Sequence, residues 1–182
     1  YWSALHHYGY TEQIPTTTFV ATTAQRGSTV LEIEELGLTY RFVVLAARQF
    51  FGLRSIWIEG EEITITDQAK TVVDCFDRPE YCGGIVEAAK GLHEALTEGH
   101  VSPPQLTEYV TRMGNRTIFK RMGYLVELMA LPVGQELQRW RQDLSAGYGL
   151  LDPLASDDGP YDSRWQLRLN RSPADLKDWM VH

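Results

Sequence analysis

Several features that place proteins in broad classes are missing from this sequence. No apolar run approaches the roughly 18 residues that a membrane-spanning helix requires. Cysteine is scarce, with only Cys75 and Cys82 among 182 residues. A disulfide across the turn between them is one interpretation, but so few cysteines beside so many apolar residues favour two reduced, buried thiols. Reduced thiols indicate a cytoplasmic protein.

Positive charge is also in short supply. The chain has 17 lysines and arginines against 24 aspartates and glutamates, which gives a formal net charge of -7. Such a surface does not attract a phosphate backbone as a whole. Any binding to nucleic acid would therefore need a local basic patch.

The usual catalytic signatures are absent: there is no G-x-S-x-G elbow, P-loop, H-E-x-x-H helix, paired C-x-x-C or G-x-G-x-x-G after a strand. His6 and His7 are adjacent, and adjacent positions on a helix point too far apart to chelate one metal ion. The pair Gly83-Gly84 opens a helix and offers N–H groups to an anion, but without a downstream lysine or hydroxyl a structural turn is favoured. We therefore expect no cofactor, no metal and no enzymatic activity.

What is present begins with strand-like segments. Ile63 and Ile65 alternate with Thr64 and Thr66, the period of a strand with one buried face. The segment 38–45 is the most strand-like of the chain and is expected to be central. The remaining expectations here are a helix end at 1–9, strands at 16–23 and 30–34, and a hairpin of 54–58 with 62–65. The first third is thus predicted to form a mostly antiparallel sheet.

Helical spacing takes over after residue 66. Asp67 is a suitable N-cap for a helix of about three turns, buried on one side, that Asp77-Arg78-Pro79 ends. Further helices are expected after Gly83-Gly84, from Ser102, from Asn115 and from Ser172, with a loop at 147–161 and a late strand at 164–170. This predicts an α+β protein: a sheet-rich lobe over about 1–66, then a helix-rich lobe over about 67–182 with a late strand and a short C-terminal helix.

One group of charges stands out from the acidic background. Arg112, Arg116 and Lys120 are spaced by four, opposite the apolar helix face. They form one basic stripe if the helix continues through Gly114-Asn115, and two pieces if the chain turns there. A solvated face and a docking surface for phosphate or an acidic protein both remain open. The candidate binding residues are Arg112, Arg116, Lys120 and Arg121, with Arg164 and Arg168 of the late strand as a second group.

Five segments, taken together and in order, resemble the C-terminal domain of the AbiEi-type antitoxins, a family also described as predicted transcriptional regulators of viral defence systems. They are WSALHHYGYTEQIP, RFVVLAARQFFG, EEITITDQAKTVVDCFDRPEYCGG, TRMGNRTIFKRMGYLVELM and YDSRWQLRLNRSP. The resemblance covers nearly the whole chain, 1–182. It places the winged-helix DNA-binding domain of the family upstream of Tyr1, outside this chain.

The resemblance implies a function without catalysis. In this family the domain counteracts a nucleotidyltransferase toxin in a type IV toxin–antitoxin system, in which the two proteins need not form a stable complex. Promoter DNA is bound by the complete protein, which represses its own operon. The family offers no catalytic residues, so only the exposed basic positions given above are carried over as candidates for nucleic-acid or partner binding.

Two alternatives from other classes remain. The first is a metal-dependent nuclease of a defence system, although in such a centre the lysine belongs on a strand and here it falls on a helix. Its candidate residues would be Glu32, Glu34, Asp67 and Lys70. The second is a DNA-binding regulator without any toxin, which would bind DNA with a steep dependence on salt.

Overall fold

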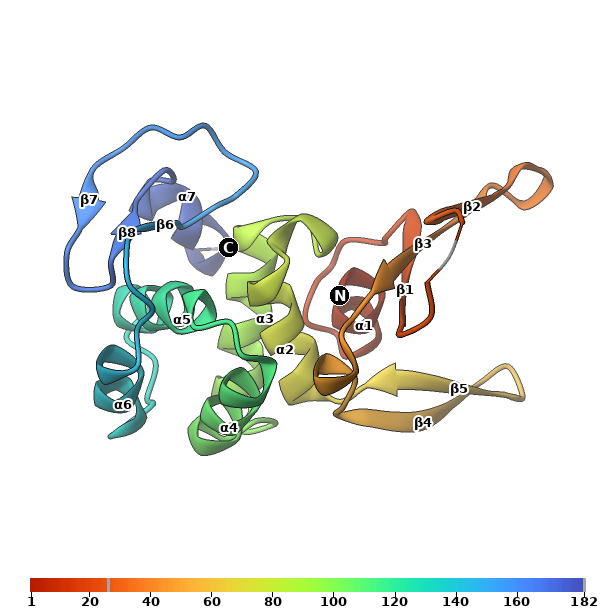
Figure 1. The fold of residues 1–182 in the computed structure, drawn as a ribbon, viewed down its shortest axis with the longest axis horizontal. Coiled ribbons are helices and arrows are strands. Elements are labelled where there is room, and N and C mark those ends of the chain that lie inside the picture. Colours follow the sequence, from red (N-terminus) through yellow and green to blue (C-terminus); the bar gives the residue numbers. More distant parts are fainter. Residues whose placement is uncertain (26, 182) are drawn as a thin grey trace.

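The computed structural model describes residues 1–25 and 27–181, in which β-structure dominates the first third and helices dominate the rest (Figure 1). The expected α+β class is confirmed. The early elements are α1 (Trp2–His7), β1 (Thr17–Thr22), β2 (Val30–Ile33), η1 (Glu34–Leu36), β3 (Leu38–Val44), η2 (Ala47–Gln49), β4 (Leu53–Ile58) and β5 (Glu61–Thr66). The later ones are α2 (Gln68–Asp77), η3 (Pro79–Tyr81), α3 (Ile85–Thr97), α4 (Pro103–Met113), α5 (Thr117–Leu128), α6 (Glu136–Gln142), β6 (Gly149–Leu150), β7 (Tyr161–Asp162), β8 (Leu167–Arg168), α7 (Pro173–Lys177) and η4 (Asp178–Val181).

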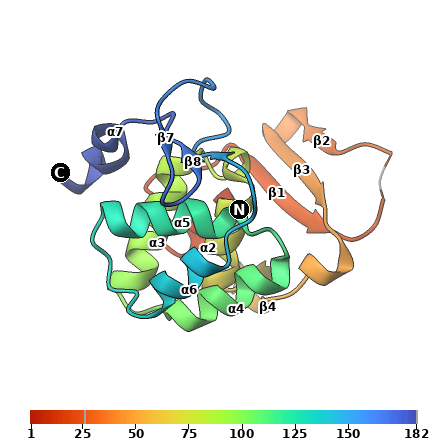
Figure 2. The same cartoon turned by 60° about the vertical axis from the view of Figure 1, so that its left-hand side comes forward.

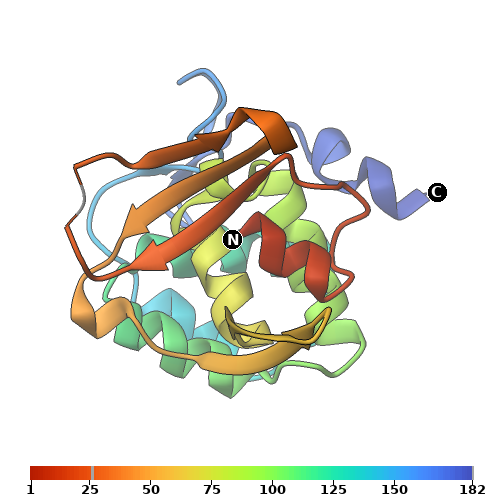
Figure 3. The same ribbon diagram turned by 90° about the vertical axis from the view of Figure 1, so that its right-hand side faces the viewer.

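The N-terminal β-structure is divided between two small sheets. One has the strand order β1-β3-β2, so β3 is central as predicted, and the other is the predicted β4–β5 hairpin. β2 pairs antiparallel with β3, and β4 pairs antiparallel with β5, whereas β1 pairs parallel with β3. The expectation of a mostly antiparallel arrangement is confirmed, but not as one sheet. Figure 3 shows α1 and part of α2 between the three-stranded sheet and the hairpin.

Helix α2 is the centre of the molecule. It contacts α1, α3, α4 and α5, and Figure 2 shows α5 lying across this group. The expectation that α2 is buried on one side only is wrong, because helices cover it all round. Lys70 and Asp74, four residues apart, are each only 1% exposed and form a buried ion pair. Burial raises the pKa of Asp74, and the Lys70 ammonium opposes that rise.

The helix starts follow the local signals in the sequence. The side chain of Asp67 accepts a 2.8 Å hydrogen bond from the N–H of Lys70, and Ser102 and Ser172 cap α4 and α7 in the same way. Gly114, at φ 76°, ends α4 in a left-handed conformation. The chain turns there, so α4 and α5 are separate helices.

The last quarter departs most from expectation. The expected strand at 164–170 is reduced to β8, which pairs with β6 and β7. Gln166, at φ 51°, lies in the turn before it. Trp165 and Leu167 are fully buried. Helix α6 had not been expected, and β6 falls within the expected loop at 147–161.

Two further expectations can be compared with the structure. Cys75 and Cys82 are both free and buried, which confirms the interpretation of two reduced thiols. Within the described residues, none of the helices is both long and apolar enough to cross a membrane.

Candidate partner-binding surface

Two of the predicted basic residues, Arg112 and Arg116, are exposed near the junction of α4 and α5. The guanidinium carbon of Arg112 lies 4.0 Å from the centroid of the Phe51 ring, a cation–π contact. Arg116 forms an exposed ion pair with Asp143. Both side chains remain accessible to a ligand, so their role in binding stays a prediction.

The expectation that Lys120 and Arg121 are exposed is wrong. The ammonium group of Lys120 donates to the carbonyl oxygen of Gly147. The guanidinium of Arg121 donates to the carbonyl oxygens of Leu150, at 3.1 Å, and Phe76, at 2.8 Å. Burial lowers the pKa of both side chains. Because α4 ends before these residues, the face that carries them turns inward, and the basic stripe does not form.

The second group of basic candidates is engaged in ion pairs. Arg164 lies in the turn before β8, and its Nε donates a 2.9 Å hydrogen bond to Glu127. The same carboxylate accepts a 2.8 Å hydrogen bond from the Trp165 indole. Arg168 pairs with Asp157 at 2.9 Å. These contacts tie β8 and the turn before it to α5 and to Asp157, and both arginines keep part of their surface accessible, so their role in binding stays a prediction.

One exposed arginine near the end of α4 was not among the predicted residues. Arg48, in η2, is exposed and lies against Gly114; a Cβ built on that glycine would be 3.8 Å from Arg48 Nε. η2 and α4 are in contact. No local signal relates Arg48 to Gly114, which is 66 positions later along the chain, so only the fold brings it to this surface.

The three-stranded sheet exposes apolar side chains on one of its faces. Leu31 pairs with Tyr40, and Ile33 with Leu38, and directly opposed residues share one face of a sheet. We call these four residues the outer sheet face. Leu31 is 48% and Leu38 41% exposed. The opposite face of β3 carries Val43, which packs in a small cluster with Tyr1. The sheet thus buries one apolar face and exposes another.

The charges around the outer sheet face are mostly acidic. Glu34 and Glu35, in η1, are exposed between β2 and β3, whereas Glu32 alternates with Leu31 and Ile33 and lies on the opposite face. Apolar side chains beside carboxylates suit a protein surface better than a phosphate backbone.

The β4–β5 hairpin is a second exposed apolar element. Trp57 is 71% exposed, Ile58 43% and Ile63 42%. Its turn carries Glu59 and Glu61, both exposed. The sequence predicted the hairpin, but not that both of its faces would lie open.

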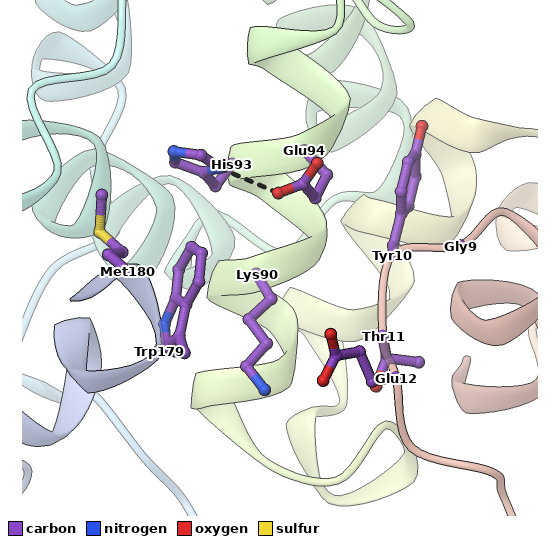
Figure 4. Close-up of a pocket in the computed structure, with 9 residues that line it drawn as sticks. All are labelled: Gly9, Tyr10, Thr11, Glu12, Lys90, His93, Glu94, Trp179 and Met180. Carbon is purple, nitrogen blue, oxygen red and sulfur yellow. Dashed lines mark hydrogen bonds and ion pairs between the residues drawn. The ribbon is translucent and has the colours of Figure 1, made fainter. Parts of the chain in front are cut away.

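A hollow of about 510 Å³ lies between α3, η4 and the segment 9–12 (Figure 4). Lys90 pairs with the buried Glu87 at 2.9 Å. His93 lies 3.3 Å from Glu94 and meets the Trp179 ring edge to face, with the ring centroids 5.1 Å apart. Lys90, His93 and Glu94 are thus already engaged, and the Trp179 contact together with the hydrogen bond from Thr11 to Glu87 fastens the C-terminal turn and the segment 9–12 to α3.

Two of the four residues of the nuclease alternative, Asp67 and Lys70, have structural roles. Lys70 is buried against Asp74, and the carboxylate of Asp67 accepts hydrogen bonds from the Lys70 N–H and from Tyr109 Oη. His6 and His7 are exposed on α1. Over residues 1–25 and 27–181, no group of three or more His, Cys, Asp or Glu side chains is arranged to hold a metal ion.

Comparison with known proteins adds no assignment. No protein-family model, no curated protein and no solved structure matches this chain. The geometry of its surface and the sequence resemblance are therefore what a functional proposal has to rest on.

Proposed function

We propose that this chain is the toxin-countering domain of an AbiEi-like antitoxin, which opposes a nucleotidyltransferase toxin in a type IV toxin–antitoxin system without catalysing a reaction. The observation that carries the proposal is the outer sheet face. An open apolar face flanked by Glu34 and Glu35 is suited to contact with a protein. The resemblance of five segments, in order along the chain, supplies the kind of partner.

The outer sheet face acts by transient contact in this proposal. Leu31 and Leu38 bury their exposed area against a partner, and burial of apolar surface contributes about 25 cal/mol per Å² before the costs of association. One face of a small sheet offers an area typical of a weak or transient interface. This is compatible with a toxin–antitoxin pair that need not form a stable complex.

The exposed arginines have a separate role in the proposal. Arg112 and Arg116, joined by Arg48, form the basic surface of this chain that contributes to an interaction with nucleic acid or with the toxin pathway. Recognition of promoter DNA belongs to the complete cytoplasmic protein, as a transcriptional autoregulator, through its winged-helix domain.

Growth rescue tests the proposal. The chain is co-expressed with the nucleotidyltransferase encoded in the neighbouring reading frame, in its natural form and as the double variant Leu31→Glu/Leu38→Glu. We expect the natural chain to restore growth and the double variant to lose rescue while remaining folded, because both side chains are exposed. Ile14→Glu is the matched control, since Ile14 is 78% exposed but lies outside the sheet.

A charge-reversal arm tests the arginines. Arg112→Glu/Arg116→Glu should weaken rescue or promoter binding, whereas Lys177→Glu on α7 should change neither. If rescue and promoter binding are both unchanged, the role of the two arginines is wrong.

Other outcomes would favour the rival functions. Failure of the folded, soluble natural chain to restore growth would contradict antitoxin activity in these residues and favour a regulator without a toxin. Cleavage of DNA or RNA that requires a divalent metal and is lost in Asp67→Ala would favour the nuclease.

A further inference from the structure

The hairpin has one edge that the fold leaves open. Glu59 and Gly60, at φ 51° and 87°, form its turn, and Ile58 pairs with Glu61 beside it. In an antiparallel hairpin with such a turn the closing pair is hydrogen-bonded, and bonded and non-bonded pairs then alternate. The N–H and C=O groups of Leu53, Ser55 and Trp57 therefore point away from β5.

The outer edge of β5 is partly occupied. The carbonyl oxygen of Thr66, which pairs with Leu53, accepts a 2.7 Å hydrogen bond from Tyr8 Oη. Within the described residues, the outward groups of β4 have no comparable partner.

β4 has few of the devices that protect a free edge, and Arg54 is its one charged residue. Its sequence, LRSIWI, contains no lysine and no proline, and its six residue pairs with β5 run without a bulge. A hairpin of only two strands is at best marginally stable in water, and a third strand or a packed face is what such hairpins require. The edge is thus suited to receiving another strand.

We propose that β4 pairs antiparallel with β4 of a second copy of this chain, about a two-fold axis at Ile56. This register brings Ser55 opposite Trp57 of the other copy, so that the outward N–H and C=O groups of the two strands form hydrogen bonds with each other. The small serine then leaves space for the indole. The two hairpins become one four-stranded sheet, and the isoleucines of each hairpin continue on one face.

Charge complementarity favours this occupant and this direction. Glu59 in the turn and Glu61 and Glu62 at the start of β5 make this end of the hairpin acidic, whereas Arg54 lies at the other end of β4. Antiparallel pairing brings Arg54 of each copy to the end where the acidic turn of the other lies. Parallel pairing would place the two acidic turns side by side, where they would repel each other. The same carboxylates would repel a nucleic acid at this edge.

Sedimentation velocity over a series of protein concentrations tests the proposal. We expect a reversible monomer–dimer equilibrium. Ser55→Pro removes an N–H that the hairpin itself does not use. Because the two-fold axis repeats each contact, the dimer loses two hydrogen bonds, and its dissociation constant should rise about tenfold or more. Thr64→Pro is the matched control: Thr64 lies directly opposite Ser55 but points to the β5 edge, so dimerisation should be unchanged.

A charge exchange keeps the proposal testable if a proline disturbs the hairpin. Arg54→Glu should weaken the dimer, and the double variant Arg54→Glu/Glu61→Arg should restore it. A chain that stays monomeric at every concentration would overturn the proposal, including the case in which β4 takes a strand from another protein. A dimer that tolerates both Ser55→Pro and Arg54→Glu would overturn it as well.

Discussion

The hydroxyl of Tyr8 donates a 2.7 Å hydrogen bond to the carbonyl oxygen of Thr66, which ties α1 to the base of the β4–β5 hairpin. Few other contacts hold this exposed hairpin. We expect Tyr8→Phe to lower the free energy of local opening of the hairpin by about 0.5–1.5 kcal/mol, the usual contribution of one such hydrogen bond. Hydrogen exchange of the amides of β5 should accelerate. Tyr10→Phe is the control, because Tyr10 bonds to His100 instead; equal acceleration in both variants would contradict the prediction.

Gly123 of α5 lies directly against the indole of Trp165. A β-carbon on Gly123 would come within 2.1 Å of Trp165 Cζ3, and both residues are fully buried. Gly123→Ala should therefore destabilise the protein by about 1–3 kcal/mol or more through overpacking, although alanine favours helices. Urea unfolding measures the change. Gly27→Ala, where a β-carbon meets nothing within 4 Å, should be close to neutral. A Gly123→Ala protein as stable as the natural one would refute this packing.

The hydroxyl of Thr107 joins two buried groups. It donates to Glu136 and accepts a 2.6 Å hydrogen bond from the indole of Trp140, which is fully buried. Thr107→Val should cost about 1–3 kcal/mol at neutral pH, because the indole N–H then lacks a partner. Thr111→Val, one turn later and exposed, should cost much less.

The same bond makes part of that cost depend on pH. The hydrogen bond from Thr107 lowers the pKa of Glu136, with burial opposing and Arg139 assisting. A lowered pKa in the folded state contributes stability that is complete above the ordinary pKa of 4.5 and is lost as the pH falls through the lower folded value. The destabilisation by Thr107→Val, measured by urea unfolding, should therefore shrink below pH 4.5. A difference that grew on acidification would contradict this assignment.

The two cysteines should be inert in the folded protein. Both are buried, and the thiol of Cys82 donates to the carbonyl oxygen of Pro79 at 3.3 Å. Burial raises the pKa of Cys82, which leaves little reactive thiolate. An Ellman assay should detect neither thiol in the native state and both after unfolding. Thr23→Cys, at an exposed position, provides the reactive control; reaction of the natural protein at a similar rate would contradict the burial.

Much of the local structure could be predicted from the sequence. Asp67, Ser102 and Ser172 cap helices because each carries its acceptor within three residues of the N–H it satisfies. The hairpin followed from alternating isoleucines and threonines beside a glycine turn. The parallel pairing of β1 with β3 could not be predicted, because a strand pattern does not specify which strand lies beside it.

The candidate site was predicted less well, and the basic residues show why. Spacing alone suggested that Arg112, Arg116, Lys120 and Arg121 share a surface. Lys120 and Arg121 are instead buried, because their acceptors are carbonyl oxygens of residues 147 and 150, which lie 27 and 29 positions away and which no sequence signal identifies. The exposure of Leu31, Leu38 and Trp57 was equally invisible, since an apolar residue in a strand looks the same whether or not a partner covers it.

The sequence by itself determined most of the segments that form helices and strands, where most helices begin, that the class is α+β, and that the thiols are few. Those properties depend on hydrogen bonds and periodicities that span a few residues. Only the tertiary structure decided which charges are buried, which sheet face stays open and which strand edge is free. Each of these depends on segments that are distant in the chain and meet only when α2 is enclosed by its neighbours.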